Sequence, residues 1–305
     1  MRALLVLNPA AGGGRGVRLL PEVIERLRSA HVEVEVHRTT SLDDAGQAAE
    51  EAAGGVDAVV AVGGDGTVGA CATGLAAARD GRAVLGIVPA GGGNDLARNL
   101  GLPFRDPLAA AALLPSLEVR RADLARVGER CFFNAAGAGF DSEVSRRANQ
   151  CLSTAPARLR YVGAVLAELV VGRLASFRLC LDGRELSARG WLVAVANSRS
   201  YGAGMLIAPA ARLDDGLLDV VVIGALSKPD FVATFPKVFS GRHVEHPDVT
   251  VHRATRIELE ADRPLPVHVD GEPAGTVPAT FEVVPGAVAV LAAAGAPALS
   301  PRSVP

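Results

Sequence analysis

Three short glycine-rich segments carry the residues of this 305-residue sequence that are best suited to handling phosphate. They run from Asn8 to Gly16, from Gly63 to Thr67 and from Pro89 to Asp95. Glycine lets backbone N–H groups approach a phosphate closely, and a helix that begins after the loop adds a favourable partial charge. One such loop is explained equally well as a tight turn between a strand and a helix. Three of them predict a phosphate-binding site.

Two acidic residues inside these segments point to a divalent cation. Asp65 lies in the second segment and Asp95 in the third. A carboxylate beside a phosphate is repelled unless a cation lies between them, so the pair predicts Mg²⁺. Either residue alone could instead be a helix N-cap, and the two roles can coexist. Phosphoryl transfer needs mainly positioning and charge neutralisation, which amides and a metal ion supply.

The elements that must position these loops alternate between strands and helices over the first 120 residues. Strands that are apolar throughout, separated by helices, are typical of a parallel sheet covered on both faces. Ligands bind beyond the carboxyl ends of such strands, so we expect the three loops to share one edge. The apolar patterns predict strands at 3–7, 32–37, 57–62 and 83–88, and helices at 17–29, 43–53, 67–79, 93–100 and 107–114.

The second part of the chain has a different pattern, in which strands follow one another and form a mainly antiparallel β-sandwich. We therefore expect a nucleotide-binding α/β domain over 1–120, a β-sandwich domain over 121–286 and a flexible tail over 293–305. The predicted strands are 118–127, 130–136, 176–182, 185–196, 217–223, 256–260, 266–270 and 279–284, and the predicted helices are 141–150, 158–171 and 228–239.

Composition excludes several classes of protein. The net charge of -2 offers no general electrostatic attraction for nucleic acid. The 4 cysteines lack the spacing of a zinc site, and only 2 lysines are present, neither in the Gly-Lys-Ser/Thr step of a Walker A loop. The first apolar run is too short for a signal peptide, and Pro and Gly interrupt the uncharged stretch 283–301. We expect a soluble cytoplasmic protein.

The glycine segments resemble those of the diacylglycerol kinase catalytic-domain family, which includes soluble bacterial diacylglycerol kinases and the sphingosine and ceramide kinases. Gly63-Gly64-Asp65-Gly66-Thr67 is shared with NAD kinases and other phosphofructokinase-like enzymes. Followed at this distance by Gly93-Asn94-Asp95-Leu96-Ala97-Arg98, it is much more specific. Further blocks, among them Val267-His-Val-Asp-Gly-Glu272, extend the resemblance from residue 4 to about residue 292.

The resemblance implies a phosphofructokinase-like nucleotide domain and a β-sandwich, with a last strand near 287–292 that returns to the first domain. It implies ATP as phosphate donor. The residues it places at the nucleotide are Asn8, Pro9, Ala10, Ala11, Gly12, Thr40, Gly63, Gly64, Asp65, Gly66, Thr67, Val68, Gly69, Gly92 and Asn94.

The same resemblance implies two Mg²⁺ sites and a general base. A catalytic Mg²⁺ and water network would involve Asp65, Asp95 and Asp123. A second, structural Mg²⁺ would lie on the Asp215 carboxylate and the carbonyls of Arg212 and Leu217. Glu272 would take the proton of the lipid hydroxyl. From the residues alone, Glu272 is only a polar residue after the Asp270-Gly271 hairpin turn, and Asp215 belongs to a solvated turn.

One position departs from the family pattern. Where the family usually has Thr, this chain has Gly92, so a hydroxyl that would contact phosphate is missing. The loss of such a charge-assisted hydrogen bond costs about 1.5–3 kcal/mol and predicts weaker ATP binding. The acidic residues of the pattern remain, and we expect an active kinase.

The leading hypothesis is a lipid kinase that uses ATP and Mg²⁺ to convert diacylglycerol to phosphatidic acid. A kinase for a sphingoid base or for NAD is an alternative, as is a catalytically silent regulator that binds nucleotide or lipid. A lipid acceptor requires transient contact with the bilayer surface, for which the helix at 158–171 is a candidate, although its pattern favours an ordinary helix packed in the core. An exposed sandwich edge would permit a homodimer. The arginines that could contact lipid headgroups are Arg15, Arg98, Arg146, Arg147, Arg158 and Arg160.

Overall fold

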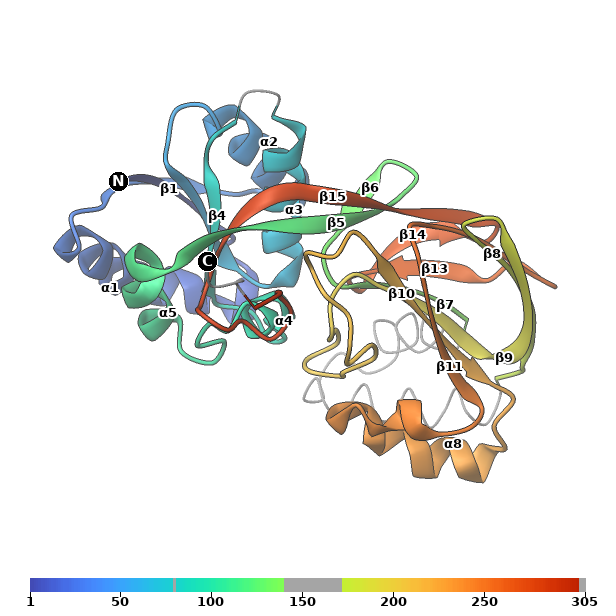
Figure 1. The fold of residues 1–305 in the computed structure, drawn as a ribbon. Coiled ribbons are helices and arrows are strands. Elements are labelled where there is room, and N and C mark those ends of the chain that lie inside the picture. Colours follow the sequence, from blue (N-terminus) through green and yellow to red (C-terminus); the bar gives the residue numbers. More distant parts are fainter. Residues whose placement is uncertain (79–80, 140–171, 302–305) are drawn as a thin grey trace.

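Two domains lie side by side, an α/β domain and a domain built mainly from antiparallel strands (Figure 1). The structure is a computed structural model, and it describes residues 1–78, 81–139 and 172–301. The helices predicted at 141–150 and 158–171 lie outside the described residues. Arg146, Arg147, Arg158 and Arg160 also lie outside them.

The first domain has four parallel strands in the order β2-β1-β3-β4. β3 is buried along its whole length, because helices cover both faces of the sheet. α1 and α5 pack on one face, and α2, α3 and α4 on the other. The elements are β1 (Arg2–Leu7), β2 (Glu33–Arg38), β3 (Ala58–Gly63), β4 (Val84–Pro89), α1 (Arg15–Ser29), α2 (Leu42–Ala52), α3 (Asp65–Ala77), α4 (Asp95–Asn99) and α5 (Pro107–Leu113), with short 3₁₀ turns at Ala11–Gly13 and Leu114–Ser116.

The strand order reverses between β1 and β3, and in open α/β sheets ligands bind beyond the carboxyl ends of the strands at such a reversal. The loops after β1, β3 and β4 all leave the sheet at that edge. α4 is shorter than the predicted helix at 93–100. Asn94 has φ 54°, a left-handed conformation that a right-handed helix cannot contain, so the helix begins only at Asp95.

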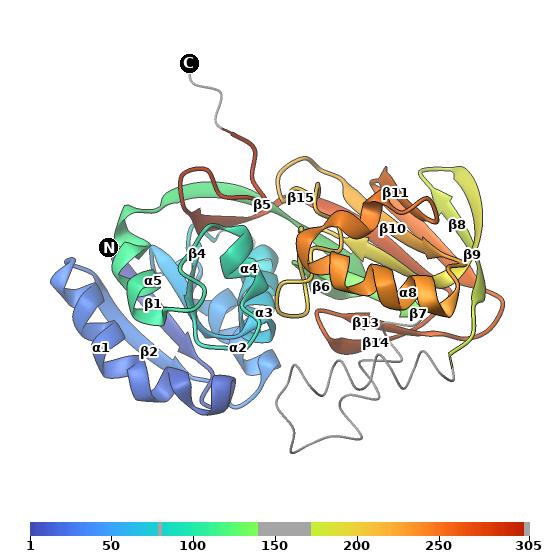
Figure 2. The ribbon, with the colours of Figure 1, turned by 90° about the horizontal axis from the view of Figure 1, so that it is seen from below.

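The second domain contains the antiparallel strands and a helical segment packed on one face of the sheet (Figure 2). The predicted helix at 228–239 ends at Thr234, because Pro236 has no N–H and a 3₁₀ turn follows. The elements are β5 (Glu118–Val127), β6 (Arg130–Phe132), β7 (Ala135–Gly139), β8 (Ala175–Leu181), β9 (Arg184–Ala196), β10 (Leu218–Gly224), α8 (Lys228–Thr234), η3 (Phe235–Ser240), η4 (Arg242–Glu245), β11 (Val249–Ala254), β12 (Arg256–Ala261), β13 (Pro266–Val269), β14 (Glu272–Thr276) and β15 (Ala279–Ala292).

One strand prediction needs correction, and two strands were not predicted. The expected strand at 130–136 is two strands, because β6 pairs with β5 while β7 pairs with β9 and β13. β11 and β14 were not predicted. β14 contains Pro273 and Gly275 and is exposed along most of its length, so it lacks the alternation that marks a half-buried strand.

A two-stranded ribbon joins the domains. β5 and β15 pair antiparallel from Val127 and Phe281 to Glu118 and Ala292, with an irregularity between Val284 and Val288. The end of β15 then lies parallel to β4, with Val290 opposite Leu85. The boundary expected near residue 120 therefore falls inside β5, and the two strands run side by side across both domains (Figure 1).

The segment expected to be a flexible tail is packed into the protein as far as Ser300. Ala298 and Leu299 are 0% and 5% exposed. The Ala298 N–H donates to the Asn99 carbonyl at 3.1 Å, and the Ala298 carbonyl accepts from the Leu213 N–H at 2.8 Å. Small side chains, which look featureless in sequence, fit this narrow space between the domains. Residues 302–305 lie outside the described part.

Across the described ranges, which omit 79–80, 140–171 and 302–305, no helix is long and apolar enough to cross a bilayer.

Candidate active site

The three glycine loops contact one another at the edge of the parallel sheet. A Cβ on Gly91 would lie 2.4 Å from the Gly64 Cα, so the second and third loops meet where neither has a side chain. Gly12 has φ +56°, and its Cβ would lie 2.1 Å from the Ala90 carbonyl oxygen. Gly92, by contrast, faces open space. The backbones of the loops therefore pack directly on one another, which only glycine permits at these positions.

Asn8 and Thr67 connect the first loop with the start of α3. The Asn8 amide donates to the Thr67 hydroxyl at 3.1 Å, and its carbonyl oxygen accepts from the Ala10 N–H at 3.0 Å. A Cβ on Gly63 would lie 2.5 Å from the Thr67 Oγ1, so glycine is required there. These contacts bring the 8–12 and 63–69 segments together, as the predicted phosphate site needs.

Asn94 and Thr40 lie at the same edge but use their side chains locally. The Asn94 amide donates to the carbonyls of Gly91 and Phe104 at 3.0 and 2.9 Å, and its oxygen accepts from the Gly91 N–H at 3.0 Å. The Thr40 hydroxyl donates to Asp44 at 3.0 Å. The Asn94 side chain therefore braces the third loop, and its predicted place at the nucleotide would have to come through its backbone.

Asp65 and Asp95 form a buried acidic pair. Asp65 is the first residue of α3, and its carboxylate accepts from the Leu96 N–H at 3.1 Å. Burial, and then the negative charge of Asp95, raise the pKa of Asp65 to about 6. Asp95 is 2% exposed, and burial raises its pKa as well. Its nearest counter-charge is the Arg98 Nε, 3.7 Å away, so the pair carries more negative charge than its surroundings neutralise.

A third carboxylate, Asp270, belongs to the same region and was not predicted as a site residue. It accepts hydrogen bonds from the N–H groups of Phe133, Asn134 and Ala135 at 3.1–3.2 Å. Burial raises the pKa of Asp270 to about 7, and the charge of Asp65 adds to the rise. The sequence signalled only a hairpin turn here, because nothing in an Asp-Gly step tells whether the side chain points inward.

The same turn delivers Glu272. Asp270 and Gly271 both have positive φ, and Glu272 then begins β14 with an exposed side chain. A Cβ on Gly69 of α3 would lie 4.0 Å from the Asp270 carboxylate, so the turn lies against the first turns of α3. Glu272 is thus an exposed carboxylate two residues after Asp270, and its role as general base stays a prediction.

The hydrogen-bond partners of the Asp123 carboxylate lie in the 214–217 turn and in β15. Its carboxylate accepts from the N–H groups of Gly216 and Gly286 at 2.8 and 2.6 Å. Burial raises the pKa of Asp123, and the charges of Asp215 and Asp214 contribute to the rise. Its predicted part in a Mg²⁺ and water network with Asp65 and Asp95 stays a prediction, while its carboxylate pins the irregularity in the β5–β15 ribbon to the 214–217 turn. Chain position alone could not show this.

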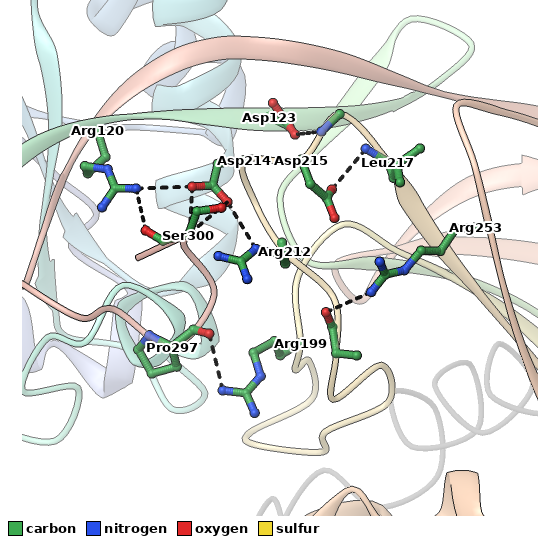
Figure 3. Close-up of polar contacts among 12 residues, drawn as sticks. Arg120, Asp123, Arg199, Arg212, Asp214, Asp215, Leu217, Arg253, Pro297 and Ser300 are labelled. Atoms are coloured by element: carbon green, nitrogen blue, oxygen red, sulfur yellow. Dashed lines mark hydrogen bonds and ion pairs between the residues drawn. The ribbon is translucent and has the colours of Figure 1, made fainter. Parts of the chain in front are cut away.

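Near Asp123, the carboxylates of Asp214 and Asp215 also accept hydrogen bonds. Asp214 accepts from the Ser300 N–H at 2.7 Å and from the Arg120 guanidinium at 3.2 Å. Asp215 accepts from the Leu217 N–H at 3.1 Å. One short segment of the chain carries all three residues predicted to hold the structural Mg²⁺, Arg212, Asp215 and Leu217 (Figure 3). We call Asp123, Asp214 and Asp215 the ribbon acids, and Asp65, Asp95 and Asp270 the cleft acids.

A small apolar cavity of about 40 Å³ lies in the second domain, between the sheet and the helical segment α8–η3. Phe231 and Phe235 stack at 6.3 Å between ring centroids and close one side. His243 lies in its wall, 1% exposed, with its Nε2 3.0 Å from the Ile207 carbonyl. The lining residues are Leu192, Tyr201, Met205, Ile207, Ile223, Leu226, Phe231, Thr234, Phe235, Val238 and His243.

Comparison with known proteins relates these features to a family. Residues 2–127 match the family described as the diacylglycerol kinase catalytic domain. A diacylglycerol kinase of Mycobacterium tuberculosis is 39% identical over 93% of this chain and 93% of its own. The chain belongs to the diacylglycerol kinase family.

Other members agree along nearly the whole chain. Residues 134–292 match the YegS C-terminal NAD kinase beta sandwich-like domain. A Bacillus subtilis diacylglycerol kinase is 30% identical over 92% of both chains. A Pseudomonas aeruginosa protein named probable lipid kinase YegS-like is 34% identical over 98% of this chain and 96% of its own. A Bacillus anthracis crystal structure, described as a candidate diacylglycerol kinase, superposes with TM-score 0.80 at 26% identity, covering 97% and 96%.

These matches confirm the resemblance, the α/β-plus-β fold and the prediction of a kinase of the diacylglycerol kinase type. ATP as phosphate donor follows from the same membership. In the described part of the chain, no three His, Cys, Asp or Glu side chains gather as a metal site built from side chains would require. The under-neutralised Asp65–Asp95 pair nevertheless fits Mg²⁺, which commonly takes one or two carboxylates and completes its shell with water and phosphate.

Proposed function

We propose that this diacylglycerol kinase family member transfers the γ-phosphate of ATP, with Mg²⁺, to the free hydroxyl of diacylglycerol and so forms phosphatidic acid. The observation that carries the proposal is the meeting of three glycine loops with the cleft acids and the Glu272 turn at one sheet edge. Backbone amides of the loops and the positive end of α3, a 13-residue helix, would bind the phosphates.

The carboxylates would divide the chemistry between them. Asp65 and Asp95 would hold Mg²⁺, which supplies charge neutralisation for the transferring phosphoryl group when bound. Glu272 would accept the proton of the acceptor hydroxyl as its oxygen bonds to the γ-phosphorus and the bond to ADP breaks. The exposure of Glu272 leaves room for an acceptor beside it.

The apolar cavity favours a lipid as acceptor. Its lining is apolar except for Thr234, His243 and the Tyr201 hydroxyl, and burial lowers the pKa of His243, which keeps that ring uncharged. At about 40 Å³ the space is too small for a whole acyl chain, so a chain would enter as side chains such as Met205 change rotamer. A lipid acceptor also requires the protein to reach a bilayer surface transiently.

Two alternatives are tested in the same experiment. A sphingoid base would offer a similar tail, and Gly92 leaves a phosphate contact absent, which is what a silent nucleotide-binding regulator would also show. We would incubate purified protein with labelled ATP, Mg²⁺ and either micellar diacylglycerol, micellar sphingosine or soluble NAD. Asp65→Asn protein purified in the same way controls for a contaminating kinase.

We expect label in phosphatidic acid, and none above the control with NAD. Label mainly in a sphingoid base or in NAD would overturn the acceptor assignment. Label in no acceptor, with ATP still bound, would support the regulator.

A further inference from the structure

The segment that follows β9 reaches from the second domain to the cleft acid Asp95. The Ser200 hydroxyl donates to Asp95 Oδ1 at 3.1 Å, and the Ala203 N–H donates to Asp95 Oδ2 at 2.7 Å. Two residues upstream of Ser200, the Ser198 hydroxyl accepts from the Asn99 amide at 3.0 Å. Both oxygens of a first-domain carboxylate are thus oriented by second-domain donors.

The backbone of this segment is specialised for that contact. Tyr201 and Met205 exchange two hydrogen bonds, at 3.1 and 3.0 Å, and close a tight loop. Inside it, Gly202, Ala203 and Gly204 all have positive φ, of 58°, 67° and 102°. Alanine rarely adopts such a conformation, so the loop holds the Ala203 N–H in a direction that ordinary turns do not provide.

The opposite side of the same loop lines the apolar cavity. Tyr201 and Met205 are both in the cavity wall, and Met205 is 2% exposed. The Met205 Cε lies so near Gly202 that a Cβ there would be 2.4 Å away. A ligand that displaces the Met205 side chain would therefore press on the loop whose amide holds Asp95.

We propose that the Ser200–Met205 loop positions the Asp95 carboxylate and couples that position to the filling of the apolar cavity. Ser200 and Ala203 are positioning residues, because they act on the reaction through Asp95. The coupling rests on the proposed function, in which an acyl chain enters the cavity. Bound acceptor and bound Mg²⁺–nucleotide should then strengthen each other's binding, since a coupling free energy is reciprocal.

The positioning role is tested by binding with Ser200→Ala beside a matched control. Ser198→Ala removes a serine that is equally buried, at 0% exposure, and does not contact Asp95. Its hydroxyl instead donates to the Asn134 side chain and the Ser200 carbonyl, both at 3.1 Å. We expect calorimetric affinity for Mg²⁺–ADP to fall about 5–20-fold in Ser200→Ala and to change less than about twofold in Ser198→Ala. Equal losses of Mg²⁺–ADP affinity in the two variants would show that Ser200 supports the fold and does not position Asp95.

The coupling is tested by repeating the titration with dioctanoylglycerol in detergent micelles. Wild-type affinity for Mg²⁺–ADP should rise about 3–10-fold over empty micelles, and Ser200→Ala should lose this gain. The same affinity with and without dioctanoylglycerol would overturn the coupling, even where Ser200 proves to position Asp95.

A third measurement needs no ligand and separates this inference from the proposed function. Melting temperatures of Ser200→Ala, Asp95→Asn and the double variant form a cycle, with Ser198→Ala replacing Ser200→Ala in a parallel cycle. We expect the Ser200 and Asp95 losses to combine non-additively and the Ser198 and Asp95 losses to add. Additivity in both cycles would overturn the positioning role. Absence of any nucleotide binding would refute the proposed function and the coupling, while the cycle still decides Ser200.

Discussion

The cleft acids and the ribbon acids are similar in composition and differ in their surroundings. In the cleft, the charge of Asp95 raises the pKa of Asp65. Asp95 accepts hydrogen bonds from Ser200 and Ala203, and its nearest cation lies 3.7 Å away. In the ribbon, Asp214 is held by Arg120 and Ser300, and Asp123 by two backbone amides. A carboxylate whose charge is neutralised by nearby protein groups stabilises the contact between the domains. A carboxylate whose charge is only partly neutralised can bind a cation.

This contrast has consequences for stability. Burying an unpaired charge costs free energy, and a protein retains such a charge where function requires it. The ion pair with Arg120 and the hydrogen bond from Ser300 make Asp214 a contributor to the joint between the domains. Substitutions of the cleft acids should therefore lower activity, whereas substitution of Asp214 among the ribbon acids should lower the free energy of unfolding.

The largest effect is expected at Glu272, the exposed carboxylate beside the cleft acids. Glu272→Gln should lower kcat about 10²–10⁴-fold, because the amide cannot take up a proton. The free energy of unfolding should change little, since the side chain is exposed. Steady-state rates with diacylglycerol and urea unfolding measure the two quantities. A variant with normal kcat would remove the general base from the account.

Asp214→Asn probes the ribbon acids and should act on stability. The variant loses the charge that pairs with Arg120 at 3.2 Å and weakens the contact with Ser300. We expect the free energy of unfolding to fall by about 1.5–3 kcal/mol, with kcat within about threefold of wild type below the melting temperature. Urea titration followed by circular dichroism measures the loss. An unchanged free energy of unfolding would mean that the contacts of Asp214 with Arg120 and Ser300 do not stabilise the fold.

The pH dependence of stability should reveal the raised pKa of the cleft acids. Asp65 titrates near 3.8 when unfolded and at about 6 when folded, so the folded chain binds more protons between these values. Its contribution to stability is present below pH 4 and is lost as the pH rises through 6. In metal-free buffer, the stability gained by Asp65→Asn should therefore be about 1–3 kcal/mol larger at pH 7.5 than at pH 5.

A control for this titration is Asp182, an exposed acid whose pKa is lowered by hydrogen bonds from Thr255. It is ionised in both states throughout pH 5–7.5, so Asp182→Asn should show a constant difference from wild type. A constant difference for Asp65→Asn as well would contradict the account of an unmet charge in the cleft.

The smallest effect concerns the loop that departs from the family pattern. A Cβ at Gly92 would meet open space, so a threonine fits there without displacing neighbours. Gly92→Thr should lower the KM for ATP up to about tenfold, equivalent to about 1.4 kcal/mol, and Gly92→Ala should not. Equal values for the threonine and alanine variants would show that the missing hydroxyl carries no contact with phosphate.

The features predicted well from sequence are those encoded locally. Glycine clusters after apolar strands foretold three loops at one edge, because parallel strands end on the same side. The contact of Gly91 with Gly64 and the closeness of Asp65 to Asp95 follow from that topology.

The features that escaped prediction depend on which way a side chain turns or on distant pairing. Asn94 turns into its own loop, Asp270 turns inward from a hairpin, and Asp123 finds partners at Gly216 and Gly286. The burial of Ala298 depends on a gap between domains that the sequence of the segment does not describe.

The central claim is that the cleft acids, and not the ribbon acids, serve phosphoryl transfer to a lipid. The most direct test measures labelled phosphatidic acid formed from ATP and diacylglycerol by wild type, Asp65→Asn and Asp214→Asn side by side, below the melting temperature of each. The account predicts that Asp65→Asn loses at least about 100-fold in kcat and that Asp214→Asn stays within about threefold. Retained activity in Asp65→Asn, or a comparable loss in a folded Asp214→Asn, would contradict it.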